Sequence, residues 1–145
     1  MRDRQRVPLN IPMDIRDELS GWITAGYPEE VCGLLVGRRT EDGFQVERVV
    51  QARNLEQNRK RDRYELAPDD WLATENRARQ EGLEVVGVWH SHPDHPARPS
   101  KTDLEAAWEG YAYLIVSVTA RGTADARSWL LVEGRFEEQP LEDKA

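Results

Sequence analysis

The sequence predicts an α/β (α+β) fold in which a curved mixed β-sheet is flanked by helices. Short β-branched, apolar runs alternate with longer segments whose apolar residues recur at helical spacing. Gly-containing turns separate several of these runs, and no internal repeat is present. A chain of 145 residues suits one domain that buries its own core. We therefore expect a single domain over 1–145, with a core from about 9 to 139 and a frayed tail at 140–145.

Each expected element has its own signal in the sequence. Apolar residues at helical spacing predict helices over 11–25 and 68–82, the second with Trp71, Leu72 and Ala78 facing inward. The turn around Gly43 predicts a hairpin. The expected strands and the third helix are, in order, strands 31–38 and 44–53, strand 84–90, a helix from Ser100 through Trp108, strand 111–119, and a hairpin of 128–132 with 135–139.

Composition limits the class of protein. The formal net charge of −7 argues against nucleic acid as the principal partner. We expect no membrane partner, because no apolar run approaches the roughly 18 residues of a membrane span. The first residues lack the apolar core of a signal peptide, and the single cysteine excludes an internal disulfide framework. These features predict a cytoplasmic protein and leave homo-oligomerisation open.

The segment from His90 to Asp103 carries the strongest chemical signal. His90 and His92 follow a buried apolar run and, if the extended backbone persists, both point to the same side of the strand. After a proline-rich loop, Ser100 and Asp103 begin a helix. Two imidazoles and a carboxylate suit a zinc site with an open fourth position. The same residues are also compatible with surface-loop histidines and with a Ser100–Asp103 capping box.

An upstream acidic pair adds a candidate base. Glu29 and Glu30 precede Cys32-Gly33 and an apolar strand, where a carboxylate could activate a metal-bound water. With His90-Ser91-His92-Pro93, Ser100 and Asp103, this pattern resembles the JAMM (JAB/MPN+) zinc metalloprotease family over most of the chain. The compact length resembles its stand-alone prokaryotic type, and the resemblance implies the cytidine-deaminase-like JAB/MPN fold.

The resemblance also implies roles for five residues. His90, His92 and Asp103 would ligate one Zn²⁺ per chain. Glu30, rather than Glu29, matches the general base by its offset from Cys32-Gly33, and would activate the zinc-bound water. Ser100 would donate a hydrogen bond to the oxyanion.

The substrate is less directly indicated by the sequence. The resemblance implies a peptidase or isopeptidase that cuts at the C-terminal tail of a small ubiquitin-fold or sulfur-carrier protein, and we expect the tail to bind extended at a sheet edge. The alternatives are a metal-free scaffold of the same fold and a zinc peptidase for another substrate, such as a cell-wall or phage-tail peptide. A zinc deaminase would need two cysteines, and the chain has one.

Three further features are interpreted as structural. His95 is expected to be a loop residue, and Cys32 inert packing in a buried strand. The basic run at 53–63 is expected to form a solvated loop, with contact to an acidic partner as the alternative.

Overall fold

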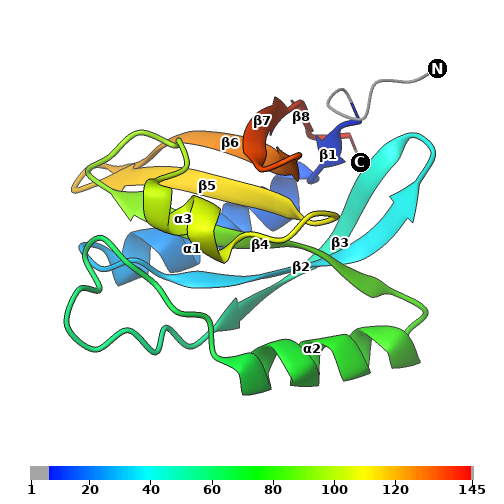
Figure 1. Ribbon diagram of the computed structural model, residues 1–145, viewed down its shortest axis with the longest axis horizontal. Coiled ribbons are helices and arrows are strands. Elements are labelled where there is room, and N and C mark those ends of the chain that lie inside the picture. Colours follow the sequence, from blue (N-terminus) through cyan, green and yellow to red (C-terminus); the bar gives the residue numbers. More distant parts are fainter. Residues whose placement is uncertain (1–6, 145) are drawn as a thin grey trace.

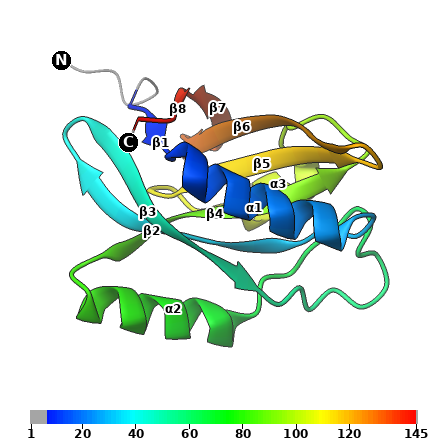
Figure 2. The same cartoon turned by 180° about the vertical axis from the view of Figure 1, so that it is seen from behind.

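The computed structural model describes residues 7–144, which form one eight-stranded mixed sheet and three helices. The strands lie in the order β7-β6-β5-β4-β2-β3-β1-β8. The sheet is strongly curved, with α1 across one face and α3 on the other (Figures 1 and 2). This architecture confirms the predicted α/β (α+β) class. The elements are β1 (Leu9–Asn10), α1 (Met13–Gly26), β2 (Cys32–Thr40), β3 (Gly43–Ala52), α2 (Pro68–Gln80), β4 (Glu84–Pro93), α3 (Lys101–Ala106), β5 (Ala112–Thr119), β6 (Gly122–Val132), β7 (Arg135–Gln139) and β8 (Leu141–Glu142).

Strand β4 lies near the middle of the sheet and organises the site. It runs antiparallel to β2 and parallel to β5, and α3 lies in the connection between the two parallel strands. All of its residues except Glu84 are buried. Ligand sites in sheets of this kind form beyond the carboxyl ends of parallel strands, which is where β4 delivers His92.

The face under α1 holds the larger hydrophobic core. Leu19 and Ile23 of α1 pack on Leu35, Leu114 and neighbouring strand residues. Trp89 belongs to this core, and its ring stacks on that of Trp22 with centroids 6.1 Å apart. The Trp89 indole N–H also donates to the carbonyl of Val50 at 3.1 Å.

The opposite face holds a smaller core that supports the site. Val88 of β4 packs here with Leu34, Val85 and Tyr113, against partly buried Tyr64 and other aromatic residues. Because Trp89 faces α1 while Val88 faces this core, alternation along β4 places His90 and His92 on the face of Val88.

The C-terminal tail and the strands at the chain ends differ from the sequence prediction. Instead of fraying from residue 140, the chain forms β8, which pairs in parallel with β1. Leu9 donates its N–H to the Pro140 carbonyl, and Ile11 donates to the Glu142 carbonyl, both at 2.8 Å. Two-residue strands leave no periodic pattern in a sequence, so backbone pairing alone reveals them. Residue 145, the last of the expected tail, lies outside the described residues.

One side-chain prediction and the predicted extent of the third helix are also wrong. Leu72, expected to face inward, is 57% exposed. The third helix ends at Ala106 because Ala107 adopts an extended backbone, and Trp108 is 71% exposed. Both apolar residues therefore face solvent on the side of the sheet that carries the smaller core.

Within residues 7–144, no helix combines the length and the apolar character that crossing a bilayer requires.

Candidate metal centre and its surroundings

The two histidines and the aspartate converge, as the sequence predicts. His90 Nε2 lies 3.3 Å from Asp103 Oδ1, and His92 Nε2 lies 3.2 Å from Asp103 Oδ2. One ligand atom from each residue fits within a cluster whose members all lie within 4.8 Å of one another. A strand end supplies both imidazoles, and the first turn of α3 supplies the carboxylate.

The surroundings of the histidines fit a metal ion. His90 is buried, yet neither of its ring nitrogens has a well-aligned hydrogen-bond partner. Buried polar atoms are normally satisfied, so an orphaned imidazole beside a carboxylate suggests a missing ligand. His92 Nδ1 lies 2.9 Å from the Pro96 carbonyl, which leaves Nε2 directed at Asp103. A backbone carbonyl on the far nitrogen is the usual way in which a ligating histidine is oriented.

The pKa shifts of His90 and Asp103 favour the forms that ligate a metal, whereas the shift of His92 does not. Burial lowers the pKa of His90, which favours the neutral imidazole that ligates metals. Burial alone would raise the pKa of Asp103, but the two imidazoles and the backbone N–H of Ser100 outweigh it and hold that pKa well below its usual value. Burial lowers the pKa of His92, but Asp103 and the Pro96 carbonyl raise it more, so its net shift is upward.

Tyr64 was not singled out by the sequence analysis. Its ring stacks on His90 with centroids 4.4 Å apart and an interplanar angle of 26°. The tyrosine follows the basic run at 53–63, where no periodic signal marks it as buried. It covers one face of the His90 ring.

Glu30 is buried at 5% exposure, just before β2. Cys32, two residues later, pairs directly with His90 across the sheet, so the carboxylate comes from the segment that leads into the strand next to the imidazoles. Burial raises the pKa of Glu30 to about 8, an effect that nearby Asp103 and Asp62 reinforce and His92 opposes. A carboxylate with a raised pKa beside a candidate metal centre has the properties of a general base.

The segment around Glu30 is fixed by contacts that the sequence did not reveal. Its backbone N–H donates to the Lys60 carbonyl, and Asn54 Nδ2 donates to the Glu30 carbonyl at 3.0 Å. Asn54 Oδ1 accepts from the N–H groups of Glu56 and Glu65, at 3.0 and 2.9 Å. Asn54 therefore holds Glu30 and both ends of the following loop together. An asparagine at a strand end, where side chains often bond to the backbone, is the signal that could have suggested this role.

Ser100 forms the capping box that the sequence left as one alternative. Its Oγ accepts from the Asp103 N–H at 3.1 Å, and its own N–H donates to Asp103 Oδ2 at 2.8 Å. The side chain also lines an open cavity together with Glu30 and His92. The capping geometry therefore positions Asp103 and leaves Ser100 facing the same space as the candidate base.

The remaining residues singled out from the sequence lie as expected. His95 is exposed in the loop after β4. Cys32 is buried in β2, and burial raises the pKa of its thiol to about 12, which makes it unreactive. The run at 53–63 lies almost entirely outside regular secondary structure, as a largely exposed connection between β3 and α2.

Two cavities open beside the metal cluster. One, of about 610 Å³, we call the apolar groove; it adjoins Asp103 and its main apolar lining residues are Leu66, Trp71, Leu72, Val88, Trp108 and Tyr113. The other, of about 410 Å³, we call the basic mouth; its charged and site residues include Glu30, His92, Arg59, Arg63, Arg98 and Lys101. Asp62, Arg63 and Thr102 line both cavities, so the two adjoin each other.

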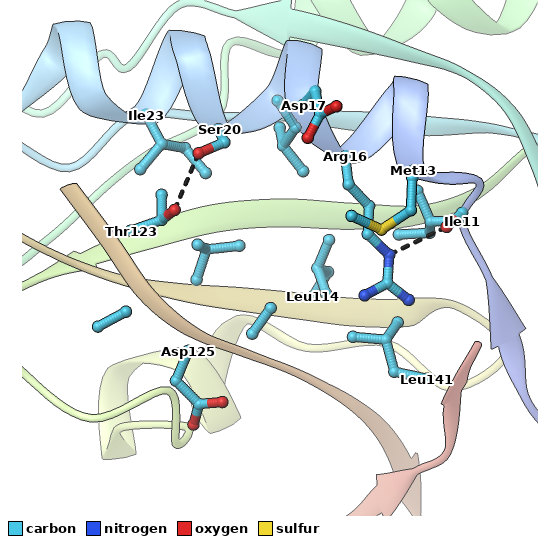
Figure 3. Close-up of a pocket in the computed structure, with 14 residues that line it drawn as sticks. Ile11, Met13, Arg16, Asp17, Ser20, Ile23, Leu114, Thr123, Asp125 and Leu141 are labelled. Carbon is cyan, nitrogen blue, oxygen red and sulfur yellow. Dashed lines mark hydrogen bonds between the residues drawn. The ribbon is translucent and has the colours of Figure 1, made fainter. Parts of the chain in front are cut away.

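A third cavity, of about 260 Å³, lies between α1 and the sheet (Figure 3). A hydrogen bond of 2.9 Å joins Ser20 to Thr123 beside it, and Arg16 Nε donates to the Ile11 carbonyl at 2.9 Å. None of the three candidate ligands lines this cavity. We therefore treat it as a packing gap of the α1 face.

Comparison with known proteins places related sequences over most of the chain. The family model described as prokaryotic homologs of the JAB domain matches residues 12–132. A desampylase of Haloferax volcanii is 36% identical over 121 residues, which cover 80% of this chain and 85% of that protein. A probable TtuB-protein conjugate cleaving protease of Thermus thermophilus is 32% identical, covering 88% of this chain and 78% of that protein. A CysO-cysteine peptidase of Mycobacterium tuberculosis is 32% identical, and the match covers 92% of this chain and 89% of that protein.

A solved structure shares the fold as well. Protein DSY2949 of Desulfitobacterium hafniense superimposes with a TM-score of 0.81 at 30% identity, covering 94% of each chain. Together, the family match over most of the chain and these relatives identify the chain as a member of the family of prokaryotic homologs of the JAB domain.

Proposed function

We propose that this protein is a zinc-dependent peptidase or isopeptidase that hydrolyses the amide bond at the C-terminal tail of a small ubiquitin-fold or sulfur-carrier protein. The observation that carries the proposal is the largely buried cluster of His90, His92 and Asp103, with Glu30 placed near it by the segment that leads into the neighbouring strand β2. Two neutral imidazoles and one carboxylate form a zinc set that leaves one position open, as hydrolytic zinc sites do.

When bound, zinc supplies a Lewis acid, acidifies water and favours the ionised form of Glu30. Glu30 then accepts a proton from the attacking water and delivers it to the leaving amine. The Ser100 hydroxyl faces the same cavity and donates a hydrogen bond to the oxyanion as it forms.

The relatives and the apolar groove support the choice of substrate. The names of two relatives describe cleavage of TtuB-protein conjugates and of CysO-cysteine. In this chain, Leu72 and Trp108 expose large apolar surfaces on the groove beside Asp103. Exposed apolar surface around a groove of this kind is a feature of protein-binding sites. We propose that the carrier protein docks there and that its tail leads from the groove to the metal cluster.

Two measurements on the purified protein test this function. Metal analysis is expected to find one zinc per chain, and Asp103→Ala should lower that content sharply. Intact-mass analysis, after incubation with Gly-Gly-ending ubiquitin-fold carriers extended at the C-terminus, should show loss of the extension. Glu30→Gln serves as the matched control, because it should retain zinc but lose cleavage.

Two results would count against the proposal. Full zinc content and activity in Asp103→Ala would overturn the ligand assignment. A zinc-loaded protein that cleaves none of a broad set of extended carriers would overturn the substrate class.

A further inference from the structure

The two cavities beside the metal cluster have opposite chemical character. The apolar groove presents mainly aromatic and aliphatic side chains, whereas four arginine or lysine residues line the basic mouth, one of which, Arg63, also lines the groove. Glu30 lines the basic mouth and does not line the apolar groove. A substrate that spans both therefore meets the base on only one side of its scissile bond.

The position of Glu30 assigns a direction to the substrate, and this step rests on the proposed function. A base that takes the proton from water must also return a proton to the leaving amine. The amine side of the scissile bond must therefore lie within reach of Glu30, in the basic mouth. The acyl side, which belongs to the carrier protein, then lies toward the apolar groove.

The charges of the basic mouth are largely uncompensated. Arg59 pairs with Asp62, with Nη2 2.5 Å from Oδ2. Arg63, Arg98 and Lys101 are exposed, and no ion pair involves their side chains among residues 7–144. This local excess of positive charge stands out on a chain whose formal net charge is −7. A surface of this kind attracts anionic groups and disfavours cationic ones.

We infer that the leaving group carries a carboxylate close to the scissile amine, which the basic mouth recognises through Arg63, Arg98 and Lys101. The carboxylate can be the free C-terminus of a short extension or an acidic side chain near the new amino terminus. A lysine-rich leaving group is disfavoured, because its charge repels the same three side chains.

The test uses the zinc-loaded protein and one Gly-Gly-ending ubiquitin-fold carrier with four two-residue extensions. These are Gln-Ala-amide, which is neutral, Glu-Ala-amide with a side-chain carboxylate, Gln-Ala with a free C-terminal carboxylate, and Lys-Ala-amide. We expect the kcat/KM of at least one carboxylate substrate to exceed that of the neutral one by about 5-fold, and the Lys substrate to be slower than neutral. The faster of the two carboxylate substrates identifies the source of the charge.

Double substitutions test whether the basic mouth causes this substrate preference. Arg98→Gln with Lys101→Gln should reduce the preference, because only Arg63 of the three charges remains, and Arg98→Glu with Lys101→Glu should reverse it in favour of the Lys extension. The matched control is Arg79→Gln with Arg135→Gln, which removes the same charge from exposed residues that line neither cavity and should keep the preference. Zinc content and the melting temperature verify that each variant is folded.

The outcomes separate this inference from the proposed function. Equal rates for all four substrates, or a preference unchanged by the charge-reversed mouth, would overturn the carboxylate inference and leave the peptidase function intact. No cleavage of any extension by the zinc-loaded protein would overturn the function, and the inference with it.

Discussion

Ser100 shows how one side chain can serve both the fold and the proposed reaction. It caps α3 through the Asp103 N–H, and it lines the cavity that contains Glu30 and His92. From the sequence, these two roles were alternatives. In the structure they are geometrically compatible, because the capping box also orients the candidate metal ligand.

Ser100→Ala should therefore have two separable effects. We expect kcat to fall on the order of 100- to 1000-fold through loss of the oxyanion donor. The free energy of unfolding should fall by about 1 kcal/mol through loss of the cap, while zinc remains bound. Ser100→Thr, which can still cap, provides the control for stability. A variant that loses stability but keeps most of its rate would reduce Ser100 to a capping residue.

Glu30 gives a pH signature in the metal-free protein. Because its pKa is raised from 4.5 to about 8 on folding, the native state binds a proton that the unfolded state releases between these values. The stabilisation is fully present below about pH 4.5 and is lost as the pH rises to about 8.

Glu30→Gln removes this titration and leaves the other groups of the site in place. The difference in unfolding free energy between wild type and Glu30→Gln should shift against the wild type by about 4 kcal/mol across this window. Urea denaturation of the metal-free proteins at several pH values measures this difference. A constant difference from pH 5 to 8 would mean that Glu30 is not buried as described.

At the scale of elements, the sequence predicted the long segments well and the short ones poorly. The central strands and the first two helices carry periodic apolar patterns that survive in the structure. β1 and β8 have two residues each and depend on backbone pairing, which no local pattern encodes. β6 begins at Gly122 rather than at Ser128. The sequence did not reveal its first half, because that half is largely exposed and its apolar residues are only the small Ala124 and Ala126.

Gly33 in β2 links the motif next to Glu30 to the packing of β4. A Cβ added there would collide with the Val50 carbonyl and with the indole of Trp89, which crosses the glycine to reach that carbonyl. We expect Gly33→Ala to lower the unfolding free energy by about 1–3 kcal/mol through overpacking.

Gly21 is the matched control for this substitution. It is exposed in α1, and nothing lies within 4 Å of an added Cβ. Gly21→Ala should stabilise the protein by about 0.5–1 kcal/mol, because alanine favours a helix interior. Thermal unfolding of both variants and the wild type measures these two changes in stability. If Gly33→Ala were as stable as the wild type, the Trp89 indole could not lie against Gly33 as described.

At the scale of the whole molecule, the residues of the candidate site were easier to predict from the sequence than the cavities that surround it. His90, His92 and Asp103 were found because their spacing follows strand alternation and a helix start. Glu30 was linked to them only through resemblance to a family, since sixty residues separate it from His90. The two cavities arise from side chains of distant segments, such as Leu72 and Trp108, and no local pattern predicts their meeting.

Because β2 pairs with β4 across the sheet, a single chain break after β2 would place the base and the metal ligands on different fragments. A chain break in the exposed turn between β2 and β3 would leave Glu30 on one fragment and His90, His92 and Asp103 on the other. Neither fragment would hold both the base and the ligands, and the second would lack the strand that fills the middle of its sheet. We expect zinc-dependent cleavage only when the two fragments are expressed together, so that hydrolysis itself would report the reassembly of a split enzyme.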